Sequence, residues 1–347
     1  MFRGAGTVGL VLALAGCRYP IVLDDVHDAG AADAFVPKDT QSDSDVSCAE
    51  KYTLLKFVPQ PAQLLILVDR SSDMQTSFDS TTREAAAQDA LANAVDAFAG
   101  KIKFGFEQFP ADPTVSQCTQ GSCCAGSVID PAIDNASTMK SSILCSDPKD
   151  LSCSVASTDS PSNEALAKVR DYYKANPTTD DLYVLLVTSS EPSCAGEDQC
   201  SSARSAANDL GDENVRIIVL SVGYQPEPWS CLSQIGRRGW SPRASQLLYS
   251  ANSTSDLSSY LSEIFSAVAR SACTLNSDSG IVPPGQAQLL VWLGKTQVSQ
   301  ADWNNQDGWS ATSNQTSITL SGSACDNYLS SQDKLQVGYN ACTSQRP

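Results

Sequence analysis

The sequence predicts an α/β fold, with a doubly wound, mainly parallel, six-stranded sheet flanked by helices and a small β-rich C-terminal extension. Between residues 64 and 270, short apolar runs alternate with longer amphipathic segments. The apolar runs are strand-sized, as buried parallel strands are. After Cys273 the pattern changes to short β-like runs between Gly, Asn, Asp and Ser turns, which indicates the extension.

Each element is predicted from its own pattern. Strands are expected at 64–68, 102–109, 128–129, 182–187, 215–222 and 246–249, and helices at 84–98, 163–173, 202–210 and 256–269. The first helix, for example, places apolar Leu91, Val95 and Phe98 on one face. In the extension, short strands are expected at 289–293, 297–298, 317–320 and 335–339, without a long helix. A β-rich segment of this size is expected to need packing against the larger domain for its stability.

The N-terminus has the layout of a secretory signal, with Arg3 followed by an apolar stretch that is too short to span a bilayer. The sequence Leu14-Ala15-Gly16-Cys17 resembles the bacterial lipobox, in which the peptide is cut before the cysteine and the cysteine is acylated. The alternative is an ordinary signal peptide with a chance cysteine. The lipobox resemblance implies a lipoprotein held to the membrane only by lipid on Cys17. The residue after it, Arg18, is not the aspartate that retains lipoproteins in the inner membrane, which favours the outer membrane, with a periplasmic or surface-exposed domain.

The following segment, up to about residue 47, is rich in Asp, Ala and Ser and is expected to be a disordered spacer. The expected organisation is therefore a signal peptide (1–16), a lipidated cysteine with an acidic tether (17–47), an α/β domain (48–273) and a β-rich extension (274–347).

Charge and histidine content exclude whole classes of function. The formal net charge is −16, which argues against nucleic acid as a partner because phosphate binding needs clustered Lys and Arg. The single histidine, His27, falls in the tether, so no histidine-based dyad or triad is expected in the folded part. We therefore expect that the chain is not an enzyme.

Polar residues follow the first core strand where it ends, as Asp69-Arg70-Ser71-Ser72-Asp73. Open α/β sheets bind ligands at this carboxyl edge. The run resembles the Asp-x-Ser-x-Ser motif of von Willebrand factor type A (VWA) domains, whose metal-ion-dependent adhesion site (MIDAS) holds a magnesium-type cation. Hard cations prefer oxygen ligands and leave positions for water or a partner's carboxylate.

Two further loops match the family's remaining ligand positions. Ser160, before a predicted helix, stands where the family has a threonine, and Ser189 stands where it has an aspartate. The resemblance covers residues 62–270, and the tail is similar to that of secreted, cysteine-rich lipoproteins of myxobacterial (deltaproteobacterial) type. It implies one divalent cation, Mg²⁺, Mn²⁺ or Ca²⁺, held by Asp69, Ser71, Asp73, Ser160 and Ser189.

The site departs from the family pattern at two positions, because Asp73 replaces a serine and Ser189 replaces an aspartate. Asp159 or Glu191 is a candidate to compensate. The alternative is a degenerate site without metal, in which Asp69 caps a turn.

The cysteines indicate an oxidising compartment. Of 13 cysteines, twelve remain when Cys17 is set aside, an even number that suits a disulfide framework. Zinc is the rival use, but no cysteine pair has the spacing of a zinc knuckle. The expected pairs are Cys48–Cys273, whose positions should be close in a VWA fold, Cys194–Cys200 behind the site, and Cys325–Cys342 in the tail, with the other cysteines unassigned.

These features predict a lipid-anchored cell-envelope module that binds a protein partner at the carboxyl edge of its sheet, through a cation and an acidic side chain of the partner. A metal-free structural scaffold is the first alternative. A metal-dependent hydrolase is the second, and the lack of a base–nucleophile pair disfavours it.

Overall fold

The structure of the chain is a computed structural model. It describes residues 52–111, 123–145, 158–194, 198–238, 248–278, 289–302, 306–330 and 334–340. The expected signal peptide, Cys17 and the tether lie outside these residues, as do Cys48 and Cys342.

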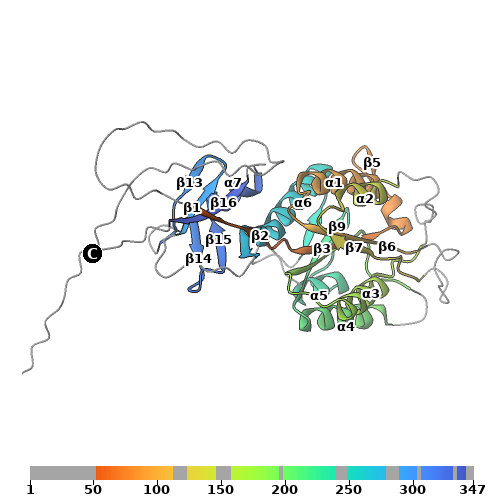
Figure 1. Cartoon of the computed structure of the whole chain (residues 1–347). Helices are drawn as coiled ribbons and strands as arrows, with labels where there is room; N and C mark the ends of the chain where they lie inside the picture. Colours follow the sequence, from red (N-terminus) through yellow and green to blue (C-terminus); the bar gives the residue numbers. More distant parts are fainter. Residues whose placement is uncertain are drawn as a thin grey trace, which may run out of the picture.

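The larger unit is an α/β sandwich around one six-stranded sheet, as the sequence predicts (Figure 1). The strand order is β10-β9-β8-β3-β6-β7, with β7 antiparallel and the other strands parallel. The strands are β3 (Gln63–Asp69), β6 (Lys103–Phe109), β7 (Ile129–Ala132), β8 (Leu182–Thr188), β9 (Val215–Val222) and β10 (Tyr249–Ala251). The four central strands are almost wholly buried because helices cover both faces.

Helices cover both faces of the sheet (Figure 1). One face carries α1 (Arg83–Ala97), α2 (Ala136–Ile143) and α6 (Thr254–Ala269), and the other carries α3 (Ser162–Ala175), α4 (Gln199–Asp212) and α5 (Cys231–Arg238). The sequence pattern does not indicate α2 or α5. Both have only eight residues, which is too short for a clear helical period. A 3-10 turn η1 (Ser72–Gln75) and a small hairpin of β4 (Ser77–Phe78) and β5 (Thr81–Thr82) lead from β3 into α1.

The smaller unit consists of two four-stranded sheets and one short helix. The sheets have the orders β1-β16-β12-β13 and β14-β15-β11-β2. Their elements are β1 (Tyr52–Leu55), β2 (Phe57–Pro59), β11 (Thr274–Ser277), β12 (Leu289–Leu293), β13 (Thr296–Val298), β14 (Gly308–Ala311), β15 (Ser317–Ser321), α7 (Ser323–Ser330) and β16 (Leu335–Asn340).

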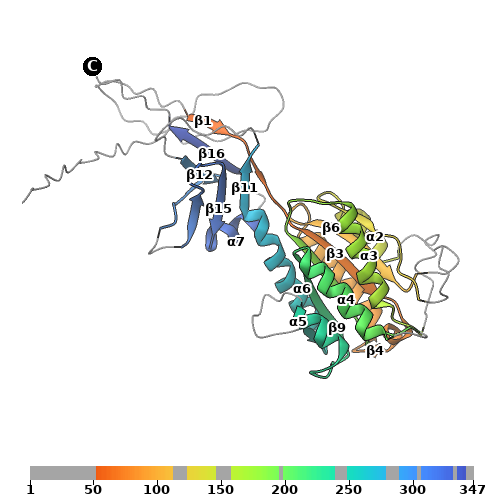
Figure 2. The same ribbon diagram turned by 90° about the horizontal axis from the view of Figure 1, so that it is seen from below.

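This unit takes strands from both sides of the α/β unit in the sequence. β1 pairs with β16 and β2 pairs with β11, so residues 52–59 belong by strand pairing to the C-terminal unit rather than to the domain expected at 48–273. Figure 2 shows the two chain segments that join the units, the strand leading into β3 and the end of α6 that continues into β11. The turn η3 (Arg270–Cys273) connects α6 to β11. Arg270 forms an ion pair with Asp326 of α7 at 2.8 Å.

Three disulfides within the described residues correct the expected pairing. Cys123 bonds to Cys194, with Cα atoms 5.7 Å apart, and Cys200 bonds to Cys231, at 5.3 Å. The expected Cys194–Cys200 bridge is therefore wrong. Cys273 bonds to Cys325 across the two units, at 5.6 Å, so neither the Cys48–Cys273 nor the Cys325–Cys342 pairing is correct. The partners come from different helices and loops, which only the packing brings together.

Candidate functional site

The candidate site lies where β3 ends, between its neighbours β6 and β8. β3 pairs with β6 on one side and with β8 on the other, and the three strands are parallel. The helix after β3, α1, covers one face of the sheet, whereas α3, which leads into β8, covers the other. Such a switch leaves a crevice at the carboxyl ends of the strands, where open α/β sheets bind ligands. Asp69 is the last residue of β3, and Thr188 is the last residue of β8.

One carboxylate connects three segments of the chain at this edge. Asp69 is fully buried. Its Oδ1 accepts a hydrogen bond from the Ser71 backbone N–H at 2.8 Å. Its Oδ2 accepts from Ser160 Oγ at 2.8 Å and from Thr188 Oγ1 at 2.6 Å. Burial raises the pKa of Asp69, and the hydrogen bonds from Thr188, Ser71 and Ser160 oppose that rise.

Several hydroxyl groups at the same edge lack a hydrogen-bond partner. Among the described residues, Ser71 Oγ, Ser189 Oγ and Ser190 Oγ are buried and meet no partner with hydrogen-bond geometry, although Ser71 Oγ lies close enough to the Asp69 carboxylate to lower its pKa. A buried hydroxyl left unpaired costs about 1 to 3 kcal/mol. Ser189 and Ser190 directly follow Thr188, and Ser71 follows Asp69 by two residues. The edge therefore offers lone-pair donors that the protein itself does not use.

Asp73, the second carboxylate of the motif, does not join this buried group. It is exposed within η1, and its carboxylate makes no hydrogen bond or ion pair in the part of the chain that the structure describes. Its backbone carbonyl accepts hydrogen bonds from Thr76 N–H and from Arg83 Nη1.

Glu191, proposed from the sequence as a compensating acid, accepts hydrogen bonds from other residues than those around Asp69. Its Oε2 accepts from the Leu232 backbone N–H at 2.9 Å, at the N-terminal end of α5. Its Oε1 accepts from Tyr224 Oη at 3.1 Å. Asp159, the other compensating candidate, lies half-buried next to Ser160. Glu191 therefore adds no carboxylate to the buried oxygens around Asp69.

A buried ion pair, which the sequence analysis missed, anchors the loop after β3. Arg70 Nε contacts Glu84 Oε1 at 2.8 Å, and both side chains are almost fully buried. Arg70 Nη1 also donates to Gln108 Oε1 at 3.2 Å. The guanidinium thus ties the motif to α1 and to the end of β6. The acid of this pair is fourteen residues away in the sequence, and nothing in the pattern marks it as the partner.

The two loops that carry Ser160 and Ser189 are held to each other. The Ser160 N–H donates to Ser193 Oγ at 2.8 Å, and the Ser193 N–H donates to the Ser160 carbonyl at 2.9 Å. The Cys123–Cys194 disulfide fixes the end of the second loop to the segment after β6. These links limit how far the oxygens of the site can move when a ligand binds.

The oxygen atoms at this edge are of the type that binds hard cations, but they carry little negative charge. Serine hydroxyls and a carboxylate are suitable ligands for Mg²⁺, Mn²⁺ or Ca²⁺. The unpaired hydroxyl oxygens of Ser71 and Ser189 are the observation that favours such a ligand. Within the described residues, however, no group of three or more His, Cys, Asp or Glu side chains is placed to hold a metal ion. A cation here would therefore depend on further negative charge from outside the buried group.

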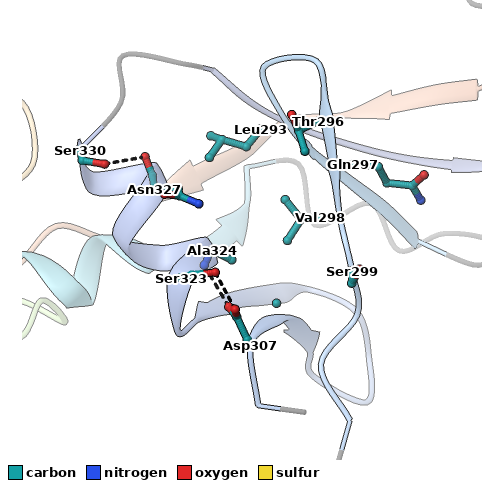
Figure 3. Close-up of a pocket in the computed structure, with 11 residues that line it drawn as sticks. Leu293, Thr296, Gln297, Val298, Ser299, Asp307, Ser323, Ala324, Asn327 and Ser330 are labelled. Atoms are coloured by element: carbon teal, nitrogen blue, oxygen red, sulfur yellow. Dashed lines mark hydrogen bonds between the residues drawn. The ribbon is translucent and has the colours of Figure 1, made fainter.

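One cavity lies elsewhere, in the β-rich unit. It has a volume of about 450 Å³ and lies between the β12–β13 hairpin and α7 (Figure 3). Among its described lining residues, Asp307 is the only titratable one. It accepts hydrogen bonds from Ser323 Oγ at 2.5 Å and Ala324 N at 3.1 Å, and these bonds lower its pKa. This carboxylate caps α7, and the cavity brings no group of reactive side chains together.

Comparison with known proteins gives matches to solved structures only. No protein-family model matches the chain, and no curated protein matches it. The chain is similar to the pilus adhesin SpaC of Lactobacillus rhamnosus GG, with 12% identity, a TM-score of 0.49, and coverage of 81% of this chain and 38% of SpaC. It therefore spans less than two fifths of that structure's length.

Two further structures are similar at the same level. A von Willebrand factor type A protein from Catenulispora acidiphila has 13% identity and a TM-score of 0.44, with 85% of this chain and 66% of that chain covered. Manganese-loaded TRAP of Plasmodium vivax has 16% identity and a TM-score of 0.43, with 62% and 77% covered. None of these three TM-scores reaches 0.5, so function is inferred from this chain's own side chains.

Proposed function

We propose that this chain is a VWA-type adhesion module of the cell envelope, which binds a partner protein at the carboxyl edge of its sheet through a divalent cation. The observation that carries the proposal is the fully buried Asp69 carboxylate beside buried serine hydroxyls without hydrogen-bond partners. The parallel sheet, with its switch in connection at β3, supports it.

In this proposal, Ser71 and Ser160 hold the cation, and Asp69 and Ser189 lie behind them. The cation supplies the positive charge that an acidic side chain of the partner recognises. Asp69 keeps the hydroxyls of Ser160 and Thr188 fixed through its two hydrogen bonds. Because the buried group holds one carboxylate, a carboxylate from the partner supplies the missing charge, and we expect weak cation binding by the free protein.

The proposal is tested by deleting hydroxyls that have no partner. In Ser71→Ala and Ser189→Ala, a buried unpaired oxygen is removed, so the metal-free protein is expected to be as stable as before or about 1 kcal/mol more stable. The same changes are expected to weaken Mg²⁺, Mn²⁺ or Ca²⁺ binding, measured by calorimetry, at least about tenfold. Ser277→Ala is the matched control, because Ser277 Oγ is also buried and unpaired but lies in β11 of the other unit.

Saturable cation binding that is weakened by the two site variants and unchanged in Ser277→Ala supports the proposal. Absence of heat with all three ions in a titration that would detect a dissociation constant of about 1 mM, or equal binding by all variants, refutes it. A metal-free scaffold is then the better assignment, and one observation already favours that alternative: Asp69 is satisfied by three hydrogen bonds from the protein itself.

We also propose that the module has no enzymatic activity. The only histidine of the chain, His27, precedes the described residues, so no histidine base can activate the hydroxyls around Asp69 there. Metal-dependent hydrolysis of phosphate or carboxylate esters by the cation-loaded protein would contradict this.

Lipid attachment at Cys17 is a further part of the proposal and rests on the lipobox resemblance. In the described part of the chain, no helix is both long and apolar enough to cross a membrane. Replacing Cys17 by Ser is expected to abolish incorporation of labelled fatty acid and to move the protein from the outer-membrane fraction to the soluble fraction. Continued labelling of the Cys17→Ser variant would refute acylation at this residue.

A further inference from the structure

An exposed tryptophan lies beside two arginines on the α4–α5 side of the larger unit. Trp229, in the loop between β9 and α5, is 75% exposed, the highest value among the described large apolar side chains. The guanidinium of Arg237 lies over its ring, 4.4 Å from the ring centroid. Arg204 of α4 and Gln234 of α5 complete a shallow cavity of about 240 Å³. We call these four residues the Trp229 surface.

The Trp229 surface is fixed in place before any partner binds. Gln234 Nε2 donates to the Trp229 carbonyl at 2.8 Å, and Arg237 Nη2 donates to the Pro228 carbonyl at 3.0 Å. The Cys200–Cys231 disulfide joins α4, which carries Arg204, to α5, which carries Arg237. A surface held in this way loses little conformational entropy on binding, and exposed Trp and Arg side chains are the types that contribute most to interfaces.

The charge of this surface is opposite to that of the chain. The formal net charge is −16. Four other arginines of the described residues each pair with a carboxylate: Arg70, Arg170, Arg216 and Arg270. Neither Arg204 nor Arg237 forms an ion pair among the described residues, although Glu227 lies on the same loop as Trp229. Two guanidinium groups that have no ion pair among the described residues thus face one cavity, and guanidinium binds carboxylates through paired hydrogen bonds.

We propose that the Trp229 surface binds an acidic peptide segment of a partner protein, with carboxylates on Arg204 and Arg237 and an apolar side chain on the Trp229 ring. This surface is separate from the Asp69 site and requires no cation. A peptide fits because it presents carboxylates and apolar side chains together, whereas a purely anionic polymer would leave the indole uncovered.

The acidic segment of this chain before residue 48 is a less favoured occupant. It leads into β1, which belongs to the β-rich unit, and β1 and α5 lie well apart in both views (Figures 1 and 2).

The test uses the full chain with Cys17→Ser in a buffer with excess chelator, so that the Asp69 site cannot contribute. The probe is a fluorescein-labelled peptide of alternating Asp and Gly with one central Phe, and binding is followed by fluorescence anisotropy. Trp229→Ala is expected to weaken binding at least about tenfold. The double variant Arg204→Glu/Arg237→Glu is expected to abolish it.

The matched control is Lys101→Glu/Lys174→Glu, which makes the same change in net charge. Both lysines lie toward the amino ends of the strands, Lys101 before β6 and Lys174 in the last turn of α3. The control is expected to bind within about twofold of the parent protein. Because Trp229 is largely exposed, its replacement is expected to leave folding intact, which circular dichroism checks.

Three results would overturn the proposal. The first is no binding up to about 1 mM peptide, and the second is equal weakening in the lysine control, which would mean non-specific attraction. The third is tighter binding of an anionic polysaccharide, polygalacturonate, through the same residues. A rise in peptide affinity on removing residues 18–47 would instead identify the chain's own acidic segment as the occupant. Failure of cation binding at Asp69 affects none of these outcomes.

Discussion

Removing one member of the Arg70–Glu84 ion pair is expected to destabilise the α/β unit strongly. The two side chains are 7% and 11% exposed, and the Nε–Oε1 distance is 2.8 Å. Replacing Arg70 by Met leaves the Glu84 carboxylate in a buried position without its cation. Breaking a buried pair in this way costs about 3 to 5 kcal/mol, because the remaining charge is uncompensated. The lost hydrogen bond to Gln108 acts in the same direction.

The double variant Arg70→Met/Glu84→Met is expected to recover most of that loss. Replacing both charges with apolar groups of similar size is often neutral or stabilising. A double-mutant cycle, with Glu84→Met as the second single variant, should therefore give a coupling of about 2 to 4 kcal/mol. The assay is urea unfolding of the oxidised protein followed by far-UV circular dichroism, with all four proteins compared at one pH.

Two results would refute this reasoning. If Arg70→Met costs less than about 1 kcal/mol, the pair behaves as a solvated surface ion pair and does not anchor the loop. If the double variant costs the sum of the two single variants, the side chains act independently. In either case the fixed position of the loop after Asp69 would need another explanation.

Three further predictions concern other parts of the fold. Burial without hydrogen bonds raises the pKa of Glu107 well above its usual 4.5, so stability should fall by up to about 1.4 kcal/mol per pH unit as pH rises from 4.5 through the raised pKa. Urea midpoints against pH should show this slope in the parent protein, and its persistence in Glu107→Gln would contradict the assignment. Replacing both Cys273 and Cys325 by Ser removes a disulfide between residues 52 positions apart and should lower the free energy of unfolding by about 4 kcal/mol in the same assay. A decrease below about 1 kcal/mol would contradict this prediction. Gly308→Ala should cost at least about 2 kcal/mol, because φ is +136° and the added Cβ would overlap the Ser299 carbonyl; a thermal midpoint unchanged by this variant would show that the backbone there can relax.

The residues around Asp69 could be located from the sequence because they depend on strand order and local position. A buried apolar run followed by Asp69 and Ser71 marks the carboxyl end of a parallel strand, and parallel strands bring such ends to one edge. The sequence also indicated Ser160, whose hydroxyl donates a hydrogen bond to Asp69 in the structure. Thr188 was part of the loop that carries Ser189 but was given no role, although its hydroxyl makes the shortest hydrogen bond to that carboxylate.

The sequence alone was sufficient for the α/β class, the six-stranded sheet and the β-rich extension. These follow from the period and length of apolar runs, which depend on each segment's own burial. It was not sufficient for the disulfide partners or for β1 and β2, which precede the α/β unit and pair with strands of the C-terminal unit. Cysteine pairing and strand pairing join residues far apart in the chain, such as Cys273 and Cys325, and no local pattern records the partner. The direction of Asp73 and Glu191 was likewise decided by tertiary packing, because a carboxylate's orientation depends on the donors that the fold brings to it.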